Sequence, residues 1–216
     1  MEVYYSMTGE MVYGEQKIND KWHYFKPGNG AMQKETFVQL ANKRVYYDEK
    51  GQMVYGPKTI EGKDFYFEYG NGKQRVGFFE SDKGIIYYLE SGGYGYGEQR
   101  VNNKWYHFDE KTGLMTKGLK DLTEKTVYYN DSGEMHYGEK KIGDKWYYFK
   151  PGNGAMQKST FVQLPDKTVY YDMNGVMLYG EQKINGKWYC FKEGTGKMMT
   201  NVWLNGFYYN AQGIRQ

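Results

Sequence analysis

The chain contains only one cysteine and four prolines among its 216 residues. No apolar run approaches the about 18 residues that a membrane-spanning helix needs, so we expect no membrane insertion. The single cysteine, Cys190, excludes an intramolecular disulfide framework and a cysteine-based zinc cluster. Residues Met1 to Tyr5 lack the basic and apolar regions of a signal peptide, and none is expected within this chain.

Charge of one sign is also lacking, because 29 Lys and Arg face 26 Asp and Glu, for a net charge of +3. Acidic and basic residues are interspersed, so nucleic-acid binding is not expected. His23, His107 and His136 fall at three different phases of the repeat described below, which argues against a metal site or a catalytic site. Cys190 lacks any repeated histidine partner. We therefore expect no cofactor, no metal and no enzymatic activity.

Aromatic residues are abundant, with 25 Tyr, 11 Phe and 5 Trp making 19% of the chain, and 29 glycines accompany them. Leu, Ile, Val and Ala are scarce, so aromatic rings must supply most of the buried area. Aromatic side chains suit strands and glycine suits tight turns, which predicts an all-β fold.

An internal repeat organises the whole sequence. Tyr-Gly recurs with its glycine at Gly14, Gly56, Gly97, Gly138 and Gly180, at spacings of 42, 41, 41 and 42 residues. Each period has two similar halves, which gives about eleven units of roughly twenty residues. We place the centres of the Trp halves at Trp22, Phe65, Trp105, Trp146 and Trp188, and those of the Val halves at Val3, Val45, Ile86, Val127, Val169 and Phe207.

Each unit has the features of a β-hairpin: a short alternating strand such as Trp-Tyr-Tyr-Phe, a Gly-rich turn and a second short strand that carries methionine. One hairpin is barely stable alone, so successive hairpins must stack, and the sequence predicts a single repeat domain over residues 1–216 with the architecture of a β-solenoid. The methionines are expected to fill the space between hairpins.

The pattern Gly-x-Trp-Tyr-Tyr-Phe-x-x-x-x-Gly-x-Met, matched from Trp146 to Met156 and from Gly186 to Met198, resembles the choline-binding and glucan-binding cell-wall repeat family. The resemblance covers essentially the whole chain. It implies a left-handed superhelix of hairpins that anchors wall hydrolases of Gram-positive bacteria or phages (endolysins), glucan-synthesising enzymes, adhesins or toxins.

In that family a choline cage combines the tryptophan of a Gly-Trp step with the first ring of Trp-Tyr-Tyr and a nearby tyrosine. In this chain the Trp halves keep the first ring but have Glu15, Glu98, Glu139 and Glu181 at the Gly-Trp position. The Val halves have Phe37, Phe78, Phe161 and Trp203 near that position but Val45, Ile86 and Val169 at the other, so that only Trp203 with Phe207 keeps both rings. Tyrosines before the repeated glycines could supply the missing face. The predicted ligand-binding residues are Trp22, Tyr24, Tyr55, Trp105, Tyr137, Trp146, Tyr148, Tyr179, Trp188, Trp203 and Phe207.

The resulting hypothesis is a noncatalytic, multivalent, extracellular module that binds a Gram-positive cell-wall polymer. Two ligands stay open: choline on teichoic acid, bound by cation–π attraction, and a glucan or other polysaccharide, stacked on the same rings. The alternative is a repeat region of an adhesin or toxin that binds a host receptor or another protein. Homodimerisation through the terminal hairpin is also left open.

Overall fold

The computed structural model describes residues 1–216, and its regular secondary structure consists of strands alone. Twenty strands form ten two-stranded sheets, each a hairpin of consecutive strands. The hairpins are β1 (Gly14–Ile18) with β2 (Lys21–Phe25), β3 (Thr36–Gln39) with β4 (Arg44–Tyr47), β5 (Gly56–Ile60) with β6 (Lys63–Phe67), β7 (Gly77–Ser81) with β8 (Gly84–Tyr88), β9 (Gly97–Val101) with β10 (Lys104–Phe108), β11 (Gly118–Asp121) with β12 (Thr126–Tyr129), β13 (Gly138–Ile142) with β14 (Lys145–Phe149), β15 (Thr160–Gln163) with β16 (Thr168–Tyr171), β17 (Gly180–Ile184) with β18 (Lys187–Phe191), and β19 (Val202–Leu204) with β20 (Phe207–Tyr209). The predicted all-β hairpin repeat is confirmed. No helix of a length and hydrophobicity to cross a membrane is present.

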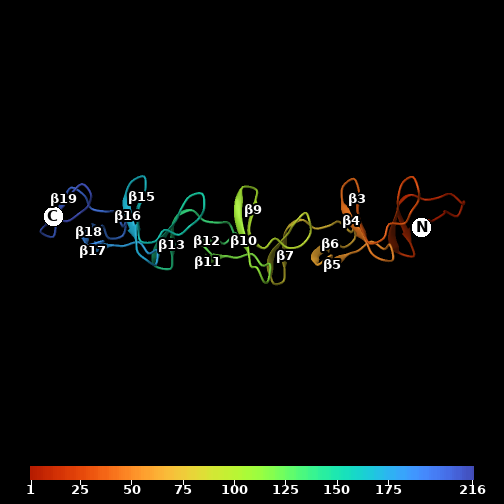
Figure 1. The fold of residues 1–216 in the computed structure, drawn as a ribbon, viewed down its shortest axis with the longest axis horizontal. Helices are drawn as coiled ribbons and strands as arrows, with labels where there is room; N and C mark the ends of the chain where they lie inside the picture. Colours follow the sequence, from red (N-terminus) through yellow and green to blue (C-terminus); the bar gives the residue numbers. More distant parts are fainter. The chain divides into compact units, whose positions relative to one another are not determined.

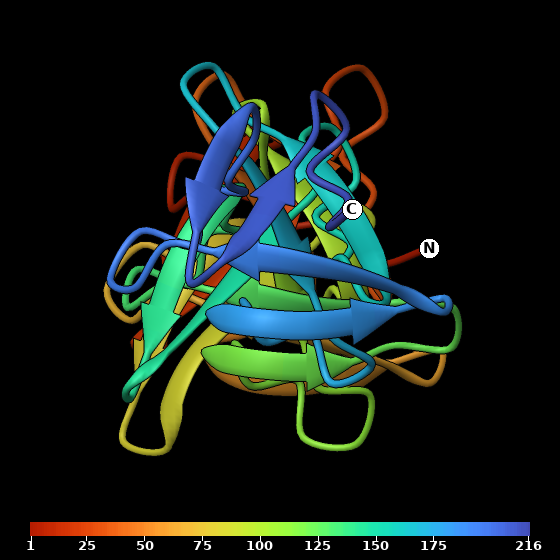
Figure 2. The same cartoon turned by 90° about the vertical axis from the view of Figure 1, so that its left-hand side faces the viewer.

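The chain forms two compact units, which are described separately. Unit 1 comprises Met1–Gly97 and Phe108–Met115, and unit 2 comprises Glu98–His107 and Thr116–Gln216. Within each unit the hairpins succeed one another in chain order (Figure 1). In unit 2, the hairpins β13–β14, β15–β16 and β17–β18 point in different directions, as the teal, cyan and blue strands of Figure 2 show. Successive hairpins of this unit are therefore turned relative to one another.

Two kinds of hairpin alternate along the chain. We call β1–β2, β5–β6, β9–β10, β13–β14 and β17–β18 the Trp hairpins, and the other five the Val hairpins. The eleventh expected unit, at the N-terminus, contains only the isolated antiparallel bridge between Tyr5 and Met11.

The turn after each second strand brings the chain back beside its own hairpin. In the Lys-Pro-Gly-Asn-Gly turn that follows β14, Gly152 and Gly154 have φ values of 92° and 67°, in the left-handed region that favours glycine. The Gly154 N–H donates to the Lys150 carbonyl at 2.9 Å, which closes the turn. Met156 then forms an antiparallel bridge with Phe149, the last residue of β14.

The methionine after the turn also couples its hairpin to the preceding one. The Met156 N–H donates to the Thr126 carbonyl of β12 at 2.8 Å, and the Met177 N–H donates to the Trp146 carbonyl of β14 at 2.9 Å. The Met156 side chain lies against Gly175 in the turn of the next hairpin, where a Cβ atom would collide with it. The predicted role of these methionines as filling between hairpins is confirmed.

One ring per hairpin forms the centre of the core. It is the last residue of each second strand, a phenylalanine in the Trp hairpins and a tyrosine in the Val hairpins, and its exposed fraction is 4% or less. These residues are Phe25, Tyr47, Phe67, Tyr88, Phe108, Tyr129, Phe149, Tyr171, Phe191 and Tyr209. Within each unit the core therefore extends hairpin by hairpin, as a stacked repeat requires.

The strand register corrects the alignment drawn from the sequence for the second Trp hairpin. Lys17 pairs with Trp22 in β1–β2, and at the same distance from the first glycine Thr59 pairs with Asp64 in β5–β6. Phe65 lies one residue further along β6. Asp64, and not Phe65, therefore takes the tryptophan position of this hairpin.

A second correction concerns the terminal hairpin. Phe207 pairs with Leu204, just as Val45 pairs with Val38 in β3–β4, and both lie two residues before the core tyrosine. Trp22 lies three residues before its core ring, Phe25. The expectation that Trp203 with Phe207 retains both cage positions is therefore wrong, because Gly206 takes the tryptophan position. Phe207 as a binding residue stays a prediction.

Adjacent glycines after β8 offer a matched test of how tightly hairpins are spaced. Gly92 and Gly93 both have φ of 84°. A Cβ atom at Gly92 would overlap the ring of Phe65, whereas at Gly93 the nearest atom is the Lys63 Cβ at 3.8 Å. We expect Gly93→Ala to lower the free energy of unfolding by about 1 kcal/mol, because alanine disfavours positive φ. Overpacking adds about 1–3 kcal/mol to that loss in Gly92→Ala. Urea denaturation measures both, and equal losses would contradict the close contact with Phe65.

Candidate functional site

Aromatic rings gather where a Val hairpin meets the Trp hairpin that follows it, which we call a Val-to-Trp junction. At the first such junction Phe37 of β3 faces Tyr46 of β4 across the strand pair, with ring centroids 4.9 Å apart in an edge-on arrangement. Phe65 of β6 adds a third ring, 5.1 Å from that of Phe37. Tyr46 and Phe65 are buried and Phe37 is half-buried, so Phe37 presents the accessible ring surface.

The same three-ring group recurs in unit 2, 124 residues further along the chain. Phe161 lies 4.8 Å from Tyr170 of its own hairpin and 5.2 Å from Tyr189 of β18. Phe161 is 38% exposed, while Tyr189 is buried. Two separate junctions therefore have the same ring geometry.

The remaining Val hairpins vary at the position of Phe37. Phe78 of β7 lies 5.1 Å from Tyr87, and Trp203 of β19 lies 5.6 Å from Tyr208. In β11 this position belongs to Leu119, which pairs with Tyr128 and offers no ring. Four of the five Val hairpins thus place an aromatic ring there, as expected for the Gly-Trp position.

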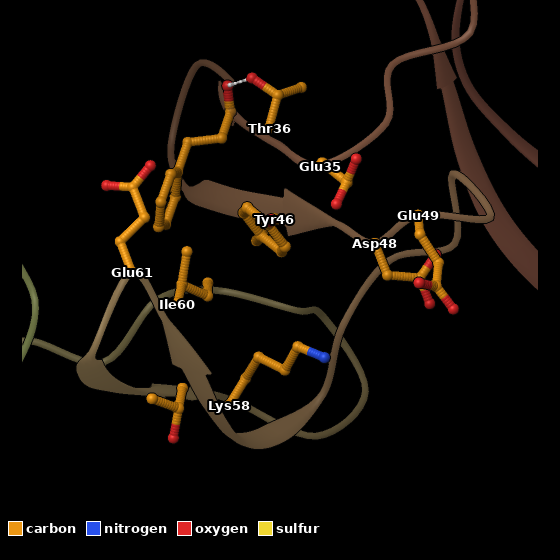
Figure 3. A pocket seen from close by; sticks show the side chains of 10 residues that line it. Glu35, Thr36, Tyr46, Asp48, Glu49, Lys58, Ile60 and Glu61 are labelled. Atoms are coloured by element: carbon orange, nitrogen blue, oxygen red, sulfur yellow. Dashed lines mark hydrogen bonds between the residues drawn. The ribbon is translucent and has the colours of Figure 1, made fainter.

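A cavity of about 660 Å³ opens beside the rings at the first junction. Phe37, Tyr46 and Ile60 give it an apolar wall, and Lys58 and four acidic residues add charge. Figure 3 shows Glu35, Asp48 and Glu49 on one side of the cavity and Glu61 on the other, with Tyr46 between them. The complete lining is Glu35, Thr36, Phe37, Tyr46, Asp48, Glu49, Lys58, Thr59, Ile60 and Glu61.

The charges around this cavity favour a cation. Burial raises the pKa of Tyr46, and the negative charges of Glu35, Glu61 and Asp48 raise it further. Four carboxylates face one ammonium group, Lys58, so the cavity has an excess of negative charge. The Arg44 guanidinium stacks 3.9 Å from the centroid of Phe37, so a cation of the protein lies on this ring, although Arg44 itself lines a different cavity. An aromatic wall with surrounding carboxylates suits a quaternary ammonium group.

Six of the eleven ring residues predicted from the sequence lie at the other kind of junction, where a Trp hairpin meets the following Val hairpin. At these Trp-to-Val junctions the rings pack against the core of the Val hairpin: Tyr24 and Tyr55 against one cluster, Trp105 against another, and Trp146, Tyr148 and Tyr179 against a third. Tyr24 and Tyr55 therefore share one core cluster, and Trp146, Tyr148 and Tyr179 share another. Of the remaining predicted residues Trp22, Tyr137, Trp188 and Phe207 are 36–40% exposed, and Trp203 is 72% exposed.

Three of these Trp-to-Val junctions carry a half-buried ion pair that sequence reasoning missed. The ammonium group of Lys43 lies 2.9 Å from Glu15, that of Lys125 lies 3.0 Å from Glu98, and that of Lys167 lies 2.9 Å from Glu139. The signal was present in the sequence, since each lysine follows its glutamate by 27 or 28 residues.

The core tyrosine of the Val hairpin joins two of these three pairs. The hydroxyl groups of Tyr129 and Tyr171 donate to Glu98 and Glu139 at 3.2 and 3.4 Å. Burial raises the pKa of Tyr171 well above its usual value, and the charge of Glu139 and the hydrogen bond to it act in the same direction. In the last hairpin burial, together with a hydrogen bond to Glu181, raises the pKa of Tyr209 to about 12.

Residues with catalytic or metal-binding potential lie apart. No group of three or more His, Cys, Asp and Glu side chains has the arrangement of a metal site. His107 is fully buried at the position of Tyr24, and its Nδ1 lies 2.8 Å from the Thr116 hydroxyl. Cys190 is buried too, and burial raises the pKa of its thiol, which keeps the unreactive protonated form.

Comparison with known proteins identifies the family. The family model described as the choline-binding repeat matches residues 1–37, 116–161 and 164–203, more than half of the chain. A second model, a cell wall binding repeat, matches residues 99–111. The chain therefore belongs to the choline-binding repeat family and is a cell-wall-binding module, as its resemblance to this family predicted.

Solved structures share the fold. The chain is similar to CbpJ from Streptococcus pneumoniae, with a TM-score of 0.69 at 19% identity over 99% of this chain and 96% of that one. It is also similar to choline binding protein F from Streptococcus pneumoniae, with a TM-score of 0.66 at 25% identity over 99% of this chain and 89% of that one. A second structure of protein F, obtained in the presence of a peptidoglycan analogue, gives a TM-score of 0.68 at 24% identity over 99% and 88%. A search of curated proteins found no match.

Proposed function

We propose that this module binds quaternary ammonium groups, such as the choline of a Gram-positive wall polymer, at its Val-to-Trp junctions. The observation that carries the proposal is the three-ring group of Phe37, Tyr46 and Phe65 beside a cavity with four carboxylates. Rings attract the cation through their faces, and carboxylates add long-range attraction. The ring group of Phe161 with its two tyrosines recurs in unit 2. Of the four carboxylates, only Asp48 has an acidic counterpart there, Asp172.

The arrangement of charges favours choline over a glycan. A sugar stacked on an aromatic ring needs free polar groups to bind its hydroxyls. The glutamates that follow the repeated glycines are the polar groups nearest in sequence to the rings of the Trp halves. Glu15, Glu98 and Glu139 instead pair with lysines of the next hairpin.

Several weak sites on one chain suit a polymeric ligand. When one site has bound, the next meets the same polymer at a high effective concentration, so that avidity exceeds the affinity of either site by about 10²–10⁴-fold. We propose accordingly that the module is noncatalytic, acts outside the cell at the wall, and serves to anchor whatever it is linked to. We also propose that residues 1–216 act as a single repeat domain.

Co-sedimentation with purified choline-bearing walls tests the proposal. We expect the chain to pellet with the walls, to be released by millimolar free choline, and to be unaffected by soluble dextran. Release by dextran alone would assign the rings to a glycan. Failure to pellet with any wall preparation would favour the adhesin or toxin alternative, in which the partner is a protein. The control is the same wall preparation after chemical removal of its choline.

A further inference from the structure

The two kinds of junction differ in one position. Glu139 of β13 pairs with Tyr148, just as Phe161 of β15 pairs with Tyr170. The Trp hairpins β1–β2, β13–β14 and β17–β18 thus have a carboxylate where Val hairpins have an accessible ring, and Glu98 follows its glycine in the same way. A carboxylate between rings is itself a partner for a cation.

A cation of the protein itself already occupies these junctions. The ammonium group of Lys167, in the turn of the next hairpin, lies 2.9 Å from Glu139 and also donates to the Thr195 carbonyl at 3.0 Å. Lys43 and Lys125 bind the carbonyls of Asn71 and Asn153 at the same distance. Each ammonium group therefore connects three successive hairpins. The three lysine side chains are only 15–23% exposed.

The last Trp-to-Val junction shows such a cation directly on rings. The Arg215 guanidinium lies 4.1 Å from the centroid of Phe207 and 4.8 Å from that of Trp188. Glu181 is 3.7 Å away. Both ring distances are within the about 6 Å over which cation–π attraction acts. Two aromatic faces and a carboxylate thus enclose a cation that comes from the chain itself.

One Trp-to-Val junction lacks both the glutamate and the lysine, which indicates that the two charges occur as a pair. Where β5–β6 meets β7–β8, Pro57 takes the glutamate position, since it pairs with Tyr66 as Glu139 pairs with Tyr148. Gly84 takes the lysine position, four residues before the core tyrosine. Both members of the pair are absent together. Rings fill the place instead, with Tyr66 and Phe79 4.9 Å apart and Tyr88 and Tyr94 5.2 Å apart.

We infer that Lys43, Lys125, Lys167 and Arg215 close their four Trp-to-Val junctions to a ligand cation, because each places a cation of the protein there. Arg44 over Phe37 at 3.9 Å and Lys140 over Tyr128 at 5.2 Å are protein cations at two Val-to-Trp junctions, so the inference concerns the Trp-to-Val junctions alone. The inference rests on the proposed function for the identity of the natural ligand. Whether a lysine ammonium group takes the place of a ligand cation can be tested without knowing the natural ligand.

The test removes one internal cation and supplies an external one. Lys167→Ala vacates the ammonium position and leaves Glu139 without its partner. Tetramethylammonium is the probe, and its binding to the full chain is followed by nuclear magnetic resonance titration and by thermal unfolding. We expect Lys167→Ala to bind one more tetramethylammonium ion than the unsubstituted chain does. We also expect the probe to raise the Tm of this variant by several degrees more than that of the unsubstituted chain.

Two further variants identify the cause of any gain. Adding Glu139→Gln to Lys167→Ala removes the carboxylate, and we expect the additional site to disappear. Lys34→Ala breaks the exposed pair between Lys34 and Glu2, and should gain no site. A Lys167→Ala chain that is folded and binds no more probe than the parent would overturn the inference.

Misfolding of the variant is also informative. Lys167→Met keeps most of the aliphatic packing, and an empty cation site in it should be refilled by the probe. If both variants stay unfolded at high tetramethylammonium concentration, lysine does not stand in for a free cation and the inference fails. A parent chain that binds no choline at all would overturn the proposed function, while a gain of probe binding in Lys167→Ala would still support the present inference.

Discussion

Replacing both Phe37 and Phe161 by alanine is expected to lower retention on choline-bearing walls by about 100-fold, since each site loses about tenfold, or 1.4 kcal/mol. That loss lies within the about 0.5–2 kcal/mol that a cation gains from an aromatic face. Phe161 presents the accessible face of its three-ring group, and Phe37 lines the cavity at the first junction. The two losses multiply because both sites bind the same polymer chain. Wall co-sedimentation measures the retention, and titration with free choline should show two fewer sites.

Leu119 provides the matched control for this experiment. It takes the same strand position in β11 and is similarly exposed, but it has no ring to lose. We expect Leu119→Ala to leave wall binding and the number of choline sites unchanged. Unchanged binding in the phenylalanine double variant would move the ligand away from the Val-to-Trp junctions. Equal losses in the double variant and in Leu119→Ala would indicate unfolding rather than loss of a binding ring.

The hairpins could be predicted because the signals for them are local. Glycine at positive φ and the Lys-Pro-Gly-Asn-Gly turn fix each reversal within a few residues. The register between the two strands of a hairpin is harder to predict, because it decides which residue of the second strand takes the tryptophan position. Phe65 was aligned with Trp22 because it is the first large ring of its strand. The pairing of Gly56 with Phe67 sets the register instead, and it puts Asp64 opposite Thr59 at the tryptophan position.

The candidate site could be predicted only in part. The sequence placed phenylalanine at the Gly-Trp position, and the structure confirms that Phe37 and Phe161 face tyrosines there. Which junctions admit a ligand depends on the Glu–Lys pairs. The partners of such a pair come from different hairpins, and Lys167 meets Glu139 only because the next hairpin turns back against the first. Ring composition alone therefore led to the Trp-to-Val junctions, where the rings pack around an internal ion pair.

The largest loss of stability is expected from removing a ring of the central row. Phe149 is fully buried at the end of β14, and it contacts the rings of Tyr128 and His136 at 5.9 and 6.1 Å. Phe149→Ala should cost about 3–5 kcal/mol of unfolding free energy, the usual loss for a large buried ring. The half-exposed ring of Phe161 loses less burial on truncation, so Phe161→Ala is the control with the smaller loss.

The location of that loss matters as much as its size. In a stacked repeat each hairpin gains stability from its neighbours, so a weak hairpin in the middle should uncouple the two sides instead of unfolding the whole chain. Hydrogen exchange of the Phe149→Ala chain should be fastest in β13 and β14 and in the adjoining β12 and β15, while β1 to β4 keep their protection. Amide exchange accelerated by one common factor in every strand would contradict this. It would mean that the array unfolds as a single cooperative body, and that a ring in one hairpin contributes to the stability of all the others.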